Sequence, residues 1–207
     1  MRDELTAIVL LVIAVSGLLI CYLKEPLPIA LIVPAILLTI LYALPLLPFR
    51  FLRFTRKAGV LKTILLAFTW TYVTAYLPIK LTFPHFDNIA LYILTRRFLF
   101  MLMLCIIFDS RDIAVDKIRG FRSLATDLSP VTLKCIVIII FCLFFSTNFL
   151  LPYYGISIRQ SIAFQVTTIT LLITYYYSTK KQGYIFYYFF VDGMMLFSAA
   201  ATYIASI

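Results

Sequence analysis

Residues 89–108 of this chain are IALYILTRRFLFMLMLCIIF, an apolar run that two adjacent arginines interrupt. An α-helix needs about 20 predominantly apolar residues to cross the hydrocarbon core of a bilayer. The run is continuous, whereas the strands of a membrane barrel are short segments of alternating polarity. This stretch therefore predicts a transmembrane helix.

Similar apolar runs follow one another along almost the whole chain. Of its 207 residues, 63% are hydrophobic and 13% are charged, whereas roughly a quarter of an average soluble chain is charged. We therefore predict an all-α, polytopic transmembrane helical bundle of about seven helices, with residues 1–207 forming a single transmembrane domain in the lipid bilayer. The predicted spans are residues 5–23, 27–48, 60–80, 89–108, 129–151, 157–177 and 184–206.

The basic residues are distributed unequally between the connections on the two sides of these spans. The N-terminal side carries the basic segments 50–62 and 111–134, and few basic residues fall on the other side. Because positive charge marks cytoplasmic connections, we expect a cytoplasmic N-terminus and a C-terminus on the opposite side. The net charge of +9 then reflects topology, and we expect no nucleic-acid partner, which would need a basic stripe on a soluble fold. No cleavable signal peptide is predicted, and the first helix is expected to start at Leu5.

The most informative polar segment is DSRDIAVDKIRG at residues 109–120. On a helix, Asp109, Asp112 and Asp116 share one stripe, where neighbouring carboxylates about 6 Å apart repel by roughly 3 kcal/mol. With no histidine or thiolate nearby, the segment predicts a hard cation, Mg²⁺, that also binds substrate phosphates. The alternative is a solvated loop in which the aspartates pair with basic neighbours such as Arg111.

The same segment resembles the second aspartate-rich motif of the UbiA superfamily of intramembrane prenyltransferases. YALPLLP at 42–48, RFLF at 97–100 and VDG at 191–193 are also similar to that family. Its members are nine-helix bundles that transfer a polyprenyl group from its diphosphate to an aromatic or lipid acceptor, in quinone or lipid biosynthesis. The family's first motif, NxxxDxxxD, has no counterpart here, so we expect a UbiA-type bundle that lacks its first two helices.

The resemblance implies a Mg²⁺-dependent prenyltransferase whose aspartate motif faces the cytoplasm. Asp109, Asp112 and Asp116 would be the catalytic residues and the metal ligands. The basic residues that would bind the diphosphate are Lys117, Arg53, Lys57 and Lys62. The alternative is a non-catalytic homologue or fragment that keeps the fold and binds an isoprenoid lipid or a partner subunit.

A few polar residues fall inside the predicted spans. Asp192 is expected to face the bundle, protonated or hydrogen-bonded, beside Gly193, whose small size would permit close helix packing. Arg96 and Arg97 are expected to anchor the chain at the membrane entry by extending toward the headgroups. Two further polar residues lie within spans, Asn148 and Gln165.

Overall fold

The computed structural model describes residues 29–43, 59–82, 87–119, 122–180 and 182–207. No β-strand occurs in this part of the chain, so the all-α prediction is confirmed. The chain divides into two compact units, Met1–Ile36 and Leu37–Ile207, and the described part of the first is the beginning of α2 (Ile29–Ala43). The predicted span 5–23 lies outside the described residues, and the single transmembrane domain stays a prediction.

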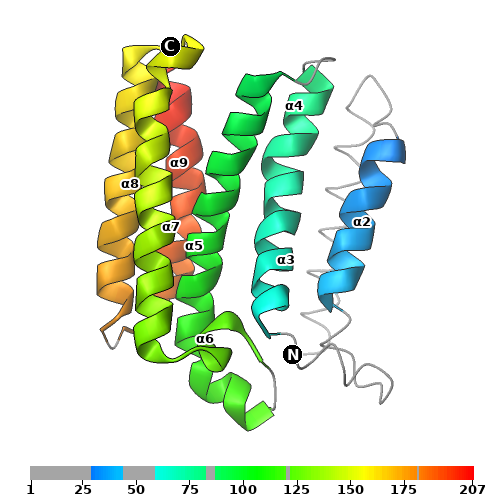
Figure 1. Cartoon of the computed structure of the whole chain (residues 1–207), viewed down its shortest axis with the longest axis vertical. Helices are drawn as coiled ribbons and strands as arrows, with labels where there is room; N and C mark the ends of the chain where they lie inside the picture. Colours follow the sequence, from blue (N-terminus) through cyan, green and yellow to red (C-terminus); the bar gives the residue numbers. More distant parts are fainter. Residues whose placement is uncertain (1–28, 44–58, 83–86, 120–121, 181) are drawn as a thin grey trace. The chain divides into compact units, whose positions relative to one another are not determined.

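The described part of the unit Leu37–Ile207 consists of a series of helices (Figure 1). Its elements after α2 are α3 (Gly59–Thr71), the π-helical turn η4 (Tyr72–Tyr76), α4 (Leu77–Thr82), α5 (Asn88–Arg119), α6 (Leu124–Asp127), α7 (Pro130–Leu150), the 3₁₀ turn η5 (Pro152–Tyr154), α8 (Ile158–Ser178), the π-helical turn η6 (Phe186–Val191) and α9 (Asp192–Ile204).

Three of the described helices are long and apolar enough to cross a membrane. They are Gly59–Thr82, Asn88–Ala114 and Pro130–Leu150, and they coincide with the predicted spans 60–80, 89–108 and 129–151. This agreement indicates a helical membrane protein. Helices also occupy most of the predicted spans 157–177 and 184–206, and their crossing of the membrane stays a prediction.

Local sequence explains where α7 and α8 begin. Ser129 caps α7, because its hydroxyl accepts a hydrogen bond from the Thr132 N–H at 3.1 Å. Pro130 follows at the first helical position, where no backbone N–H is needed for the helix, so proline fits there. Ser157 caps α8 in the same way through the Gln160 N–H at 3.3 Å. Serine at the position before a helix satisfies one of its unpaired N–H groups, so both starts follow from the sequence.

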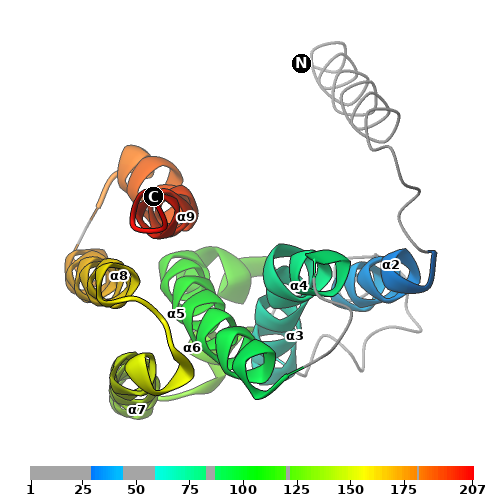
Figure 2. The same ribbon diagram turned by 90° about the horizontal axis from the view of Figure 1, so that it is seen from above.

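Helix α5 forms the core of the unit Leu37–Ile207. Every side chain from Leu99 to Ile107 is buried, and α5 packs against α3, α6, α7, α8 and η6. Seen from above, α5 lies between α3 and α4 on one side and α7 and α8 on the other (Figure 2). Apolar side chains of α7 such as Ile138, Ile139 and Leu143 are instead exposed, as expected for a lipid-facing surface.

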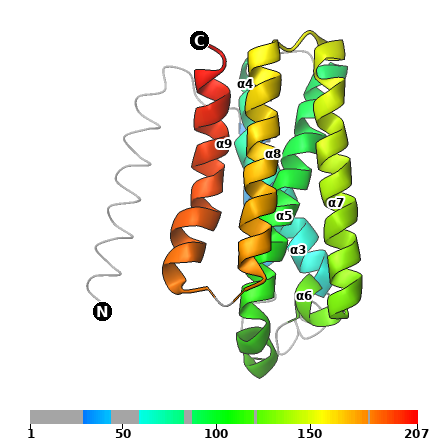
Figure 3. The ribbon, with the colours of Figure 1, turned by 90° about the vertical axis from the view of Figure 1, so that its left-hand side faces the viewer.

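One end of α5 is held by the short helix α6. Helix α6 packs against α3, α5 and α7, and Figure 3 shows it beside the beginning of α3. The backbone N–H of Ser123, just before α6, donates to the Thr126 hydroxyl at 2.7 Å. The fold thereby brings the start of α3, the polar end of α5 and α6 together, where the aspartate motif lies.

Candidate functional site

The aspartate motif lies on α5, which continues without interruption from Asn88 to Arg119. The helix extends about three turns beyond the predicted end at residue 108. Its apolar section ends at Phe108, and Asp109 is the next residue. Because the backbone is helical through all three aspartates, the prediction that they share one helix is confirmed.

Asp109 is held by the beginning of α3. The Thr63 hydroxyl donates a hydrogen bond to Asp109 Oδ2, and the backbone N–H of Leu124 donates to the Thr63 hydroxyl oxygen at 3.2 Å. Thr63 is 1% exposed, so this junction is buried. Lys62 lies near enough to act electrostatically on Asp109. The fold thus brings one residue predicted to bind diphosphate beside one predicted to bind metal.

Arg111 forms a two-point ion pair with its neighbour Asp112. Arg111 Nε donates to Asp112 Oδ1 at 2.6 Å, and Nη2 donates to Oδ2 at 2.8 Å. The guanidinium also lies over the rings of Phe108, Tyr187 and Tyr188, 5.2 to 5.4 Å from their centroids. Its remaining nitrogen, Nη1, is buried and has no hydrogen-bond partner among the described residues. An unsatisfied guanidinium nitrogen is a donor for an anionic ligand.

The ion pairing that was the alternative role for the aspartates therefore occurs at Asp112, on a helix and not in a loop. The Asp112 side chain is 39% exposed, so it can still bind a ligand from the solvent side. Asp116 is half-buried one helical turn further on and interacts electrostatically with Asp109. The motif thus has one carboxylate engaged by Thr63 and one paired with Arg111, and all three aspartates are partly exposed.

The carboxylates of the aspartate motif are compatible only with a metal site that uses few protein ligands. Among the residues that the structure describes, no three His, Cys, Asp or Glu side chains gather as metal ligands. Mg²⁺ usually binds one or two carboxylates and completes its shell with water and substrate phosphates. Asp112 and Asp116, both partly exposed, fit this smaller set, whereas Asp109 is engaged by Thr63.

The other residues predicted to bind diphosphate cannot be placed. Arg53 and Lys57 lie outside the described residues, and so does the side chain of Lys117. A second buried polar atom without a hydrogen-bond partner in the described part of the chain is Ser123 Oγ. Ser123 precedes Leu124, whose N–H donates to Thr63, so both buried atoms belong to the end of the bundle that carries the aspartate motif.

The expectations for Asp192 and Gly193 are wrong. Asp192 is exposed at the beginning of α9, because Val191 and Met194, 0% and 3% exposed, occupy the inward face of this helix. A Cβ added at Gly193 would meet no atom within 4 Å among the described residues. Gly193 therefore does not permit a close helix contact.

The expectation that Arg96 extends toward the headgroups is also wrong. Arg96 is 6% exposed, and its Nη1 donates to Thr147 Oγ1 at 3.0 Å and to Asn148 Oδ1. Asn148 in turn donates to Thr168 at 3.1 Å, whereas Gln165 is exposed. The guanidinium can be buried because α7 supplies polar partners for it and α8 supplies the ring of Phe164.

Sequence reasoning missed Thr63 and the stacked position of Arg111. Thr63 lies 46 residues before Asp109, in an apolar segment that gives no signal of a polar contact. The aromatic run 184–190, which supplies Tyr187 and Tyr188, is the one sign in the sequence of a stacking surface for Arg111.

The described helices and this site together define a helical membrane protein with acidic and basic groups gathered at one end of a buried helix. No protein-family model, curated protein or solved structure matches this chain. Its function is therefore inferred from its own residues.

Proposed function

We propose that this chain is a UbiA-like membrane prenyltransferase that binds a polyprenyl diphosphate at the aspartate end of α5. The observation that carries the proposal is the buried Arg111 Nη1, which has no acceptor among the described residues and lies beside the partly exposed Asp112. The oxygens of a diphosphate are strong acceptors for a guanidinium. The resemblance of residues 109–120 to a diphosphate-binding motif supports the same ligand.

The residues around this end of α5 would have distinct roles. Asp112 and Asp116 would hold Mg²⁺, which supplies positive charge that stabilises the departing diphosphate. Arg111 and Lys62 would neutralise further diphosphate charge, the largest electrostatic requirement of the transfer. Asp109 would keep α3 and α5 in register through Thr63.

The apolar part of the bundle would hold the polyprenyl chain. The side chains of Leu99–Ile107 are packed in the hydrophobic core, so the polyprenyl chain would lie against apolar side chains that remain exposed, such as Leu61 and Ile64 of α3. Such surroundings exclude water, which protects an allylic cation from hydrolysis while an aromatic or lipid acceptor attacks. With a cytoplasmic N-terminus, the motif would face the cytoplasm.

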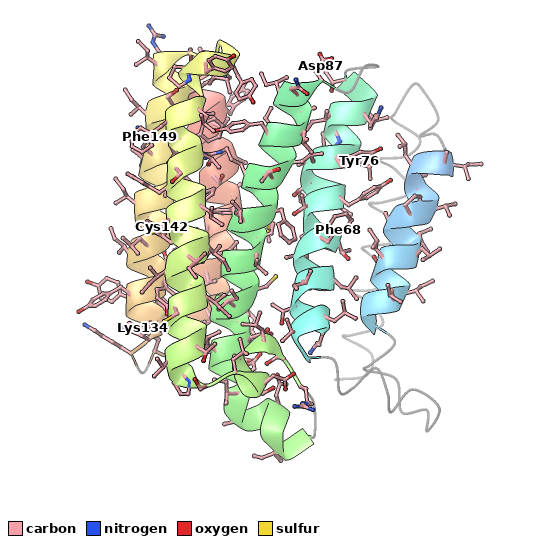
Figure 4. All side chains as sticks on the ribbon, in the orientation of Figure 1. Phe68, Tyr76, Asp87, Lys134, Cys142 and Phe149 are labelled. Atoms are coloured by element: carbon pink, nitrogen blue, oxygen red, sulfur yellow. The ribbon has the colours of Figure 1, made fainter. Side chains whose placement is uncertain are left out.

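The test is equilibrium binding of radiolabelled geranylgeranyl diphosphate to the protein purified in dodecyl maltoside, with Mg²⁺ or with EDTA. We expect Mg²⁺-dependent binding that Asp112→Asn removes. The matched control is Asp87→Asn, because Asp87 is an exposed aspartate at the opposite end of the same helix (Figure 4).

The ion pair gives this experiment a second informative outcome. If Asp112 only pairs with Arg111, Asp112→Asn releases the guanidinium and strengthens diphosphate binding in EDTA. That result, or equal binding with and without Mg²⁺, would show that Asp112 is no metal ligand and would overturn the metal role.

The same ion pair favours a second candidate, a non-catalytic homologue that binds the isoprenoid diphosphate without transferring it. In the described part of the chain, Asp112 is engaged by Arg111 and no three-carboxylate metal group is present. Binding without release of diphosphate in the presence of membrane-extracted acceptors would favour this candidate over the enzyme.

A further inference from the structure

Two adjacent arginines lie inside the apolar half of α5, far from the aspartate motif. Arg97 and Asp109 are twelve residues apart in one helix, which corresponds to about 18 Å along its axis. The proposed diphosphate site therefore gives the arginines no role. Each charged side chain inside a membrane span costs about 2.5–3.5 kcal/mol on insertion scales and usually marks a function.

Arg96 is a buried cation that is surrounded by neutral partners. Its guanidinium is enclosed between the rings of Phe144 and Phe164, at 4.9 and 4.3 Å from their centroids. Thr147 and Asn148 accept its hydrogen bonds. All these partners are electrically neutral, so they orient the guanidinium without cancelling its charge.

Arg97 brings a second positive charge to the same place. Its Nε donates to Thr74 Oγ1 at 3.1 Å, and its guanidinium lies 5.2 Å from the ring centroid of Phe100. The ion pairs formed by the described residues join Arg111 to Asp112 and Arg122 to Asp127. Neither Arg96 nor Arg97 therefore has a carboxylate partner in the described part of the chain.

Both arginines line an open cavity of about 470 Å³, within the range of about 300–1,000 Å³ that is usual for small-molecule sites. One part of its wall is apolar and includes Ile79, Ile93 and Phe100. Another part carries the hydroxyl of Ser198, whereas the Thr202 hydroxyl donates to the Ser198 carbonyl at 2.7 Å. The cavity lies between helices of the unit Leu37–Ile207, chiefly α4, α5, α8 and α9. It thus combines two cationic side chains that have no carboxylate partner among the described residues, the Ser198 hydroxyl and an apolar wall.

We propose that this cavity binds the anionic headgroup of a single-chain lipid, a carboxylate or a phosphate, through Arg97 and Arg96. The headgroup would receive charge-assisted hydrogen bonds from Arg97 and a hydrogen bond from the Ser198 hydroxyl of α9. The acyl chain would lie along the apolar wall and leave through the open side. The site is separate from the proposed diphosphate site and does not depend on Mg²⁺.

The test is equilibrium binding of three radiolabelled probes to the whole protein in dodecyl maltoside with EDTA. Oleate carries a carboxylate, oleoyl lysophosphatidate carries a phosphate, and monooleoylglycerol is neutral. We expect at least one anionic probe to bind and the neutral probe to bind about tenfold to one hundredfold more weakly, as for the loss of a hydrogen bond to a charged group. The better of the two anionic probes identifies the headgroup.

Two variants test the site itself. Arg97→Gln should weaken anionic binding by the same factor, and Ala199→Phe should block the cavity while both arginines remain. Ala199 lines the cavity and is exposed, so the larger side chain does not have to enter the core. The matched control is Arg159→Gln, since Arg159 is an exposed arginine at the beginning of α8.

Unchanged affinity in either Arg97→Gln or Ala199→Phe would overturn the proposal, as would equal binding of monooleoylglycerol. Failure of the Mg²⁺-diphosphate experiment would leave it intact, because these probes are tested without metal. Loss of anionic binding in Arg159→Gln as well would indicate a general charge effect and would also overturn it.

Discussion

Replacing Gly59 by alanine tests how closely the first residue of α3 packs against the segment before α6. A Cβ at position 59 would lie 2.6 Å from Ser123 N, 2.6 Å from Asp127 Oδ2 and 2.8 Å from the carbonyl carbon of Arg122. Two of these three atoms belong to the backbone and cannot rotate away. The segment from Arg122 to Asp127 must therefore move to admit a methyl group.

The expected cost follows from these contacts. Adding a methyl group to a well-packed region costs about 1–3 kcal/mol, and the helix propensity of alanine returns up to about 1 kcal/mol. The displacement also pulls the Leu124 N–H away from Thr63, which weakens a buried hydrogen bond next to Asp109. We expect Gly59→Ala to lower the free energy of unfolding by about 1–2 kcal/mol.

The assay is unfolding by SDS in mixed micelles, followed by the fluorescence of Trp70, the single tryptophan, in α3. The matched variant is Gly193→Ala, where the added Cβ meets no described atom within 4 Å. Gly193 lies inside α9, so alanine there should stabilise the protein by about 0.5–1 kcal/mol. The reasoning is refuted if Gly59→Ala is as stable as Gly193→Ala.

Three further predictions concern other parts of the bundle. Asn148→Ala should lower the free energy of unfolding by about 1–3 kcal/mol, because it leaves buried hydrogen-bond partners unsatisfied. Gln165→Ala, at an exposed position, should change unfolding by SDS little. Equal destabilisation by the two variants would contradict a buried hydrogen-bond network around Asn148. Arg111→Gln should weaken Mg²⁺-diphosphate binding about tenfold to one hundredfold. Lys134→Gln, which removes an exposed lysine of α7, should not weaken it. An equal loss of affinity in both variants would show that only net charge matters. In a variant whose four native cysteines are replaced by alanine, a membrane-impermeant maleimide should label Asp87→Cys in intact cells. It should label Lys134→Cys only after lysis (Figure 4). The reverse pattern would invert the proposed topology.

Much of the helical framework could be predicted because its signals are local. The apolar runs gave the three long spans, and the serines at positions 129 and 157 lie where α7 and α8 begin. The end of α5 could not be predicted from hydropathy, because its last three turns are polar. They remain helical where α6 packs against them.

The site was predicted only in the part that one helix carries. The spacing of Asp109, Asp112 and Asp116 is visible in the sequence, but their partners are not. Thr63 approaches Asp109 from 46 residues away, and the burial of Arg96 depends on which faces of α7 and α8 meet α5. The Thr63–Asp109 contact and the burial of Arg96 both arise from tertiary packing. The hydrophobic periodicity of the sequence carries no information about this packing. The same holds for glycine, since Gly59 lies in a close contact and Gly193 does not.

The charges on α5 also explain why its two ends are separate sites. No charged residue lies between Arg97 and Asp109, and at about 18 Å two unit charges attract by only about 0.9 kcal/mol at an effective dielectric of 20, against about 4 kcal/mol at 4 Å. The two ends therefore cannot neutralise each other, and each needs compensation nearby. At the acidic end Lys62, Arg111 and Thr63 provide it. At the basic end the described partners of Arg96 and Arg97 are neutral, and the proposed lipid headgroup would supply negative charge there.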